Sequence, residues 1–215
     1  MIDLADGDPS KGNFVFGCPL ALAFATRAIA RYCLGHPGWR NDLRHGLTMA
    51  RNTDPASYAA LVTYSYGLGI FFGVVRPDDH AMREAEDALH IAERSGDDLA
   101  FVWARMTLGI ALVHRDMAGE RDRGNKLLTA ISEVLLRRGH NLGDLPLVEV
   151  YSVRENARRG DRDDAIPIMR AAIDHLIRGG QLLAWGVPAT GVLAETLLDR
   201  GARMTWLKPK LRSSG

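Results

Sequence analysis

Apolar residues recur along most of this chain at intervals of three and four positions, the spacing of one face of an α-helix. In the clearest case Ala165, Met169 and Ala172 form one apolar stripe, and Gly160 and Asp161 separate this stripe from a preceding helix. The strict alternation of apolar and polar residues that marks a half-buried strand is nearly absent. The pattern therefore predicts an all-α chain.

The sequence also repeats itself. The triplet Leu-Gly-Ile occurs at 68–70 and again forty residues later at 108–110, each time in an apolar helical stretch followed by a turn and an amphipathic helix. A two-helix unit of this kind cannot bury its apolar face alone, so neighbouring units have to stack. We therefore expect a helical repeat whose stacked units form a binding surface rather than a reaction pocket.

Local signals predict several helix boundaries. Pro19 and Pro55 suit a first helical turn, where a missing N–H costs nothing, and Asp54 stands directly before the second of them. The apolar stripes predict helices over residues 19–34, 39–51 and 187–200. The chain from 203 onward is basic, has no such stripe and contains Pro209, so we expect it to be irregular.

The second helix of each unit is predicted from small and apolar residues at helical spacing. After the first Leu-Gly-Ile copy these residues are Ala81, Ala85 and Ala88. After the second copy the spacing fits only if three residues are inserted in a turn around 119–123. The matching residues are then Gly124, Leu128 and Ile131.

Together these features resemble the tetratricopeptide repeat. That family places Leu-Gly and an aromatic residue on its first helix, helix A, as at 68–69 and Phe72, and a Gly-Asp turn before its second helix, helix B. The tryptophan that precedes Leu-Gly in the family is Ser65 in one unit and Arg105 in the next. The resemblance implies a right-handed α-solenoid of about four and a half helix pairs that lacks a C-terminal capping helix.

Three parts are therefore expected along the chain. Residues 1–17 are interpreted as the tail of a preceding repeat and a loop, 18–202 as the repeat domain, and 203–215 as a short basic irregular tail. Because both ends of the array lack a cover, we expect that self-association through them can occur, for example through residues 187–198.

A second resemblance concerns the order of the turn segments. Segments such as Pro-Gly-Trp-Arg at 37–40, Ser-Gly-Asp-Asp at 95–98 and Ala-Arg-Arg-Gly-Asp at 157–161 resemble the C-terminal repeat region of actinobacterial multidomain signalling proteins of the STAND type. In that family an adenylate cyclase domain and an ATPase domain precede the repeats. The resemblance implies a regulatory part of signal transduction that retains none of the catalytic domains. It also implies a protein partner, such as the cyclase or ATPase domain of the same system.

Composition and charge exclude some classes of partner and compartment. The chain has 27 Lys and Arg against 26 Asp and Glu, so no global field attracts it to nucleic acid. Its two cysteines, Cys18 and Cys33, are too few for a disulfide framework and are interpreted as small core residues in a reducing compartment. The N-terminus is acidic where a secretory signal is basic. We therefore expect a cytoplasmic protein with no nucleic-acid partner.

Residues 55–75 could be either a membrane span or a buried helix. These 21 positions carry no charge and match the length of a membrane span of ~20 residues. Serine, threonine, tyrosine and glycine residues dilute the hydrophobicity of this segment, and its counterpart forty residues later contains Asp97 and Arg105. We therefore expect a buried helix here and no membrane span.

We find no pattern of catalytic or ligand-binding chemistry. There is no phosphate-binding Gly-rich loop, no nucleophile elbow, and no histidine pair at metal-ligand spacing. The acidic pairs at 97–98 and 163–164 are interpreted as helix starts, where carboxylates accept from exposed N–H groups. We therefore expect no enzyme activity, no catalytic residue, no metal and no cofactor.

The expected binding surface is the wall formed by the first helices of the units, because these helices line the concave face in the resembled fold. Aromatic and arginine side chains suit such a wall, since they bury large areas or pair with carboxylates. The alternative is that Trp103 and Met106 are core residues and that the arginines form a solvated face. The candidates are Thr63, Tyr66, Trp103, Met106, His114, Val150, Arg154 and Arg158.

Three functions follow as hypotheses. The first is a non-catalytic protein-interaction or regulatory module that docks a peptide, a helix or a sister domain on its concave face. The second is a small-molecule sensor, in which a ligand in the groove shifts the array between conformations that a partner distinguishes. The third is a non-catalytic fragment of an adenylate cyclase that acts only with a catalytic chain supplied in trans.

Overall fold

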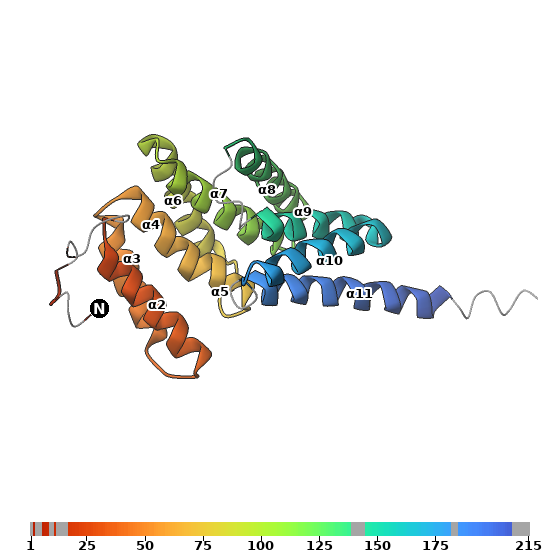
Figure 1. Ribbon diagram of the computed structural model, residues 1–215, viewed down its shortest axis with the longest axis horizontal. Helices are drawn as coiled ribbons and strands as arrows, with labels where there is room; N and C mark the ends of the chain where they lie inside the picture. Colours follow the sequence, from red (N-terminus) through yellow and green to blue (C-terminus); the bar gives the residue numbers. More distant parts are fainter. Residues whose placement is uncertain are drawn as a thin grey trace, which may run out of the picture. The chain divides into compact units, whose positions relative to one another are not determined.

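The computed structural model describes residues 2, 6–8, 11, 17–138, 145–181 and 185–207 (Figure 1). Within these ranges the regular elements are helices and there is no strand, so the prediction of an all-α chain is confirmed. The chain divides into two compact units, Met1–Glu120 and Arg121–Gly215. Most of the segment 1–17 and all of 208–215 lie outside the described residues, so the predictions for those parts stay predictions.

The first unit contains a series of helices that begin where the sequence signals place them. Pro19 is the first residue of α2, and Asp54 is the N-cap of α4, where its carboxylate accepts a hydrogen bond of 2.8 Å from the Ser57 N–H. Asp97 caps α7 in the same way by accepting from the Ala100 N–H at 2.9 Å. The elements are α2 (Pro19–Cys33), α3 (Trp39–Arg51), α4 (Pro55–Val62), η1 (Thr63–Gly67), α5 (Leu68–Phe71), α6 (Asp79–Ser95) and α7 (Asp98–Val113).

The uncharged segment forms α4, η1 and α5, and its first part, α4, is surrounded by other helices of its unit. Helix α4 contacts α2, α3, α6 and α7, and its residues from Ala56 to Val62 are all buried. A helix enclosed on every side needs no polar face, which explains why α4 carries no charge. None of the helices that the structure describes combines the length and hydropathy that crossing a membrane requires.

The helices of the first unit pack in a regular order. Helices α2, α4 and α7 contact one another in sequence, α3 packs on α2 and α4, and α6 packs on α4 and α7. The alanines predicted to face the core from α6, at positions 81, 85 and 88, are buried. Gly46 allows the close approach of α3 and α2, because a Cβ atom there would lie 3.1 Å from the Ala21 carbonyl oxygen.

The second unit contains α9 (Leu145–Arg159), α10 (Arg162–Arg178) and α11 (Val187–Leu207), and the three helices contact one another. Helix α8 (Ala118–Arg138) begins at the end of the first unit, and its greater part belongs to the second. The predicted stripe of α10, formed by Ala165, Met169 and Ala172, is buried. The predicted turn before it is also confirmed, since α9 ends at Arg159 and α10 begins at Arg162.

Two predictions in this part of the chain are wrong. Residues 119–123 belong to α8 and form no inserted turn, because Gly119 is tolerated in an exposed first turn and Arg121 is held by an ion pair with Glu155 at 3.3 Å. Gly124, Leu128 and Ile131 are nevertheless buried as predicted. Residues 203–207 are helical rather than irregular, because α11 continues past Gly201 and the first residue unable to continue a helix is Pro209.

Candidate functional site

An almost wholly apolar hollow lies in the first unit where α2, α3, η1 and α5 meet. Its cavity volume is about 30 Å³, which is room for one or two water molecules. Four aromatic side chains contribute to its lining, together with aliphatic residues and one serine. The aromatic residues are Tyr32 of α2, Trp39 of α3, Tyr64 of η1 and Phe72, which follows α5.

Ser65 is the serine of this lining. Its side chain is buried, with 3% of the residue exposed, and its hydroxyl oxygen has no hydrogen-bond partner among the described residues. Thr63 in the same short π-helix does find partners, because its hydroxyl lies 2.9 Å from both the Ala59 carbonyl oxygen and the Thr107 hydroxyl. The hydroxyl of Ser65 is therefore the polar group that the local structure leaves unpaired.

Five of the predicted binding residues lie in the first unit. Thr63 and Met106 are buried, so neither presents a surface to a docked chain in this conformation, and Met106 takes the core role of the alternative interpretation. Tyr66 and Trp103 are half-buried. The Tyr66 hydroxyl lies 3.2 Å from His80 Nε2. Burial raises the pKa of Tyr66 to about 12.

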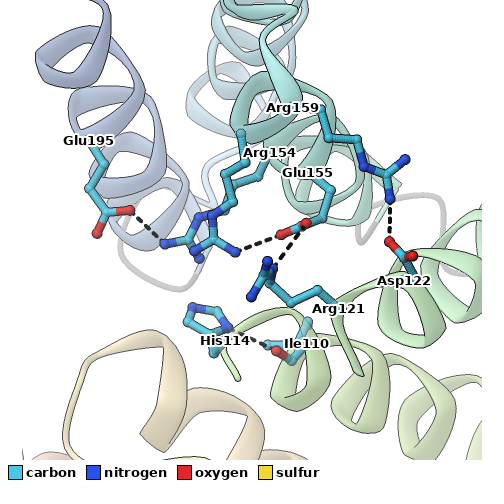
Figure 2. A network of polar contacts seen from close by, with 9 residues as sticks. Ile110, His114, Arg121, Asp122, Arg154, Glu155, Arg159 and Glu195 are labelled. Atoms are coloured by element: carbon cyan, nitrogen blue, oxygen red, sulfur yellow. Dashed lines mark hydrogen bonds and ion pairs between the residues drawn. The ribbon is translucent and has the colours of Figure 1, made fainter. Parts of the chain in front are cut away.

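His114, the fifth of these residues, ends α7 and is also half-buried. Its Nδ1 donates a hydrogen bond of 2.8 Å to the Ile110 carbonyl oxygen one turn earlier (Figure 2). This bond assigns the proton to Nδ1 in the neutral ring. The contact is local to the helix end and accounts for the position of the ring without any ligand.

The three predicted residues of the second unit all lie on α9. Val150 is completely buried and belongs to the core. Arg154 is only 8% exposed and donates to Glu195 of α11 at 2.6 Å, so the alternative that it forms a solvated face is wrong (Figure 2). Arg158 is exposed on the same helix and donates to Glu155 at 2.6 Å.

Glu155 is the centre of this polar network and is 3% exposed. One of its carboxylate oxygens accepts from Arg158, and the other accepts from Arg121 Nε of α8 at 3.3 Å (Figure 2). Such a buried carboxylate is stable only when its oxygens are paired, and two guanidinium groups supply that pairing. Arg159 adds an ion pair with Asp122 of α8 at the rim.

We call these side chains the α9 arginine cluster. Four arginines and three carboxylates meet in it. The side chains of Arg158 and Arg159 are 36% and 54% exposed, so both arginines reach solvent. The cluster consists of Arg121, Asp122, Arg154, Glu155, Arg158, Arg159 and Glu195.

Arg154 and Arg158 were predicted as residues of a binding wall, but their ion pairs and the other members of the cluster were not predicted from the sequence. Glu155 follows Arg154 in a polar stretch, and nothing in the local pattern marks it as buried. Arg121 was placed in the expected turn, so its pairing with a residue 34 positions later was not foreseen. The unusual serine at position 65 was noticed, but its unpaired hydroxyl depends on contacts that only the fold creates.

The residues nominated as helix starts lie at helix starts. Asp97 accepts from the backbone of α7, and Asp163 and Asp164 lie in the first turn of α10. Among the described residues no three side chains of the metal-ligating types come together as a metal site.

No family model, curated protein or solved structure matches this chain.

Proposed function

We propose that this chain is a non-catalytic protein-interaction and regulatory repeat module. In this proposal the helices form a right-handed α-solenoid of about four and a half tetratricopeptide-like pairs, whose first helices build the wall that docks a partner. The order of contacts in the first unit supports the proposal. There α2, α4 and α7 form one row and α3 and α6 pack beside it, as expected for consecutive pairs.

The observation that carries the proposal is the α9 arginine cluster. Its exposed guanidinium groups have a planar arrangement of donors that fits carboxylates, and the pairing of Glu155 holds Arg158 in a defined position. A pre-positioned side chain loses less conformational freedom on binding than a free one. The partner segment is therefore an acidic one, in a peptide, a helix or a sister domain.

The resemblance to cyclase and ATPase signalling proteins supports a cytoplasmic, regulatory role and suggests which domains supply that segment. Self-association is a further part of the proposal. It is supported by exposed apolar side chains on α11, of which Leu198 is 73% exposed.

Charge-matched peptides test the docking proposal. Three labelled helical peptides share the same leucine positions and carry Glu, Gln or Lys at all others, and their binding to the full chain is followed by fluorescence anisotropy. We expect the Glu peptide to bind most tightly and its affinity to fall with added salt. Arg158→Glu should weaken this binding by about five- to tenfold, since an exposed charge-assisted contact contributes about 1 kcal/mol.

Arg170→Glu is the matched control, because Arg170 is an exposed arginine of the same unit on α10. It changes the net charge of the chain as Arg158→Glu does, so a general charge effect would appear equally in both variants. The proposal fails if the three peptides bind alike, or if the two variants weaken binding to the same extent.

A further inference from the structure

The charges of this chain are divided unevenly between its two units. Met1–Glu120 has 11 Lys and Arg against 15 Asp and Glu, whereas Arg121–Gly215 has 16 against 11. The whole chain is nearly neutral, so the total hides this separation. Two copies of the chain therefore attract each other when the first unit of one faces the second unit of the other.

The acidic residues of the first unit are concentrated in and around α6. Between positions 78 and 98, eight residues are Asp or Glu and two are Arg. Part of this charge is used inside the unit, since Glu84 accepts from Arg51 and Tyr58. Three other carboxylates of the helix have side chains that are 50–78% exposed. We call these three residues the α6 acidic surface: Asp79, Asp87 and Glu93.

A polar hollow lies at the beginning of this surface, between the turn before α6 and the turn before α8, with a cavity volume of about 570 Å³. Three carboxylates, two arginines and one histidine contribute to its lining. Of these, Arg115 is held in place by donating to Glu120, Asp79 and the Pro77 carbonyl oxygen at 2.8–3.1 Å. Asp78 caps α6 with one carboxylate oxygen, and its other oxygen accepts no hydrogen bond from a described residue. A guanidinium group that enters from outside therefore finds an acceptor here.

The α9 arginine cluster is the matching surface of the second unit. Arg158 and Arg159 reach solvent, and carboxylates hold both of them in position, Glu155 for the first and Asp122 for the second (Figure 2). A guanidinium group has several N–H donors, so an arginine in one ion pair can still bind a further carboxylate. The cluster can therefore receive the carboxylates of a second molecule without losing its internal contacts.

We propose that the α9 arginine cluster binds the α6 acidic surface of a second copy of this chain. The inference rests on the docking function proposed above and names its acidic partner as the first unit of another molecule. The two surfaces differ, so the contact is heterologous and copies associate head to tail. This contact is separate from the apolar association through α11.

Sedimentation velocity of the full chain measures this association. We expect the average mass to rise with protein concentration at about 0.01 M salt and to return to that of the monomer at about 1 M, where the Debye length is only about 3 Å. Apolar association through α11 would persist at high salt, because added salt does not screen it. Leu198→Asn, on that apolar surface, should leave the low-salt association unchanged.

Charge reversal identifies the two surfaces. The first variant carries Asp87→Lys and Glu93→Lys, and it should fold because the ion pairs it removes are exposed and 3.6 and 3.7 Å long. The second variant carries Arg158→Glu and Arg159→Glu. We expect each variant alone to associate at least about tenfold more weakly than the natural chain. A mixture of the two should regain association, because both contacts between the variants then join opposite charges.

The matched control combines Arg170→Glu with Arg178→Glu, since both residues are exposed on α10 of the same unit. It changes the net charge as the second variant does and should associate nearly as the natural chain does. If the second variant does not fold, Arg159→Glu alone replaces it, because Arg158 pairs with the buried Glu155.

Three results would overturn the inference: a natural chain that stays monomeric at low salt, a control that loses association equally, or a mixture that regains none. A chain that binds the acidic peptide described above and stays monomeric refutes this inference alone and leaves the docking function standing. A chain that neither binds the peptide nor associates refutes both.

Discussion

Asp42 joins α2 and α3, and removing its charge should destabilise the first unit measurably. The side chain of this α3 residue is 5% exposed, and its two oxygens accept three hydrogen bonds from α2. Arg27 donates from Nη2 and Nε at 2.7 and 3.0 Å, and Arg31 donates from Nη1 at 2.8 Å. Asp42→Asn keeps one acceptor oxygen and turns an amide N–H₂ group toward these donors.

The expected change in the free energy of unfolding follows from these contacts. A hydrogen bond to a charged group contributes about 1.5–3 kcal/mol, but water can replace part of the loss because both arginines are 37% exposed. We therefore expect a fall of about 2 kcal/mol in the free energy of unfolding. For a chain of 215 residues this corresponds to a decrease of about 4–8 °C in Tm, measured by urea titration and calorimetry.

The pH dependence gives an independent check. Hydrogen bonding from Arg27 holds the pKa of Asp42 below its ordinary value of 3.8. The stabilisation by the ionised carboxylate is therefore complete above that value and is lost as the pH falls through the lower pKa of the folded state. The difference in stability between the natural chain and Asp42→Asn should stay constant from neutral pH down to about pH 4 and shrink below it.

Asp87→Asn is the control for this prediction. Asp87 is 55% exposed and lies 3.6 Å from Arg51, so its loss should change the free energy of unfolding by less than about 0.5 kcal/mol. If Asp42→Asn is no more destabilising than Asp87→Asn, the reasoning from burial and bidentate pairing is refuted.

Two further predictions concern packing and burial. Gly46→Ala should destabilise the chain by about 1–3 kcal/mol, because its Cβ would lie 2.9 Å from Leu61 Cδ1 and 3.1 Å from the Ala21 carbonyl. Gly191→Ala, in open space within α11, should stabilise it by up to about 1 kcal/mol, and equal effects in urea titrations would contradict the packing. Burial raises the pKa of Tyr66 from 10.0 to about 12, so its contribution to stability is present below pH 10 and is lost as the pH rises toward 12. Tyr66→Phe should therefore lose less stability than the natural chain over that interval in alkaline denaturation, and identical pH profiles would show that the hydroxyl is not buried.

Local chemistry determined most of the helix boundaries. A proline can begin a helix, an aspartate can cap one, and a glycine-aspartate turn can separate two, and each of these effects acts within a few residues. Pro19, Asp54 and Asp97 could therefore be interpreted from the sequence, and the structure confirms their positions. The buried alanines of α6 were predictable for the same reason, since their spacing defines one helical face.

Two helix boundaries could not be predicted from neighbouring residues. One depends on a contact with another helix, and the other on the lack of a helix-breaking residue. The predicted turn at 119–123 is helical because Arg121 pairs with a glutamate on another helix. The predicted irregular segment at 203–207 is helical because no residue there forbids the continuation of α11. The apolar periodicity predicts a helix boundary where the periodicity is lost. The helix itself ends only where the backbone cannot continue or where packing prevents it.

The sequence by itself thus determined the all-α class, the main helices and the faces they bury. Tertiary structure decided which polar groups find partners: Glu155 is buried with two arginines from different helices, and Ser65 is buried with no hydrogen-bond partner among the described residues. The physical reason is that periodicity reports the environment of a helix face, whereas a hydrogen bond depends on where a second chain segment places a single atom.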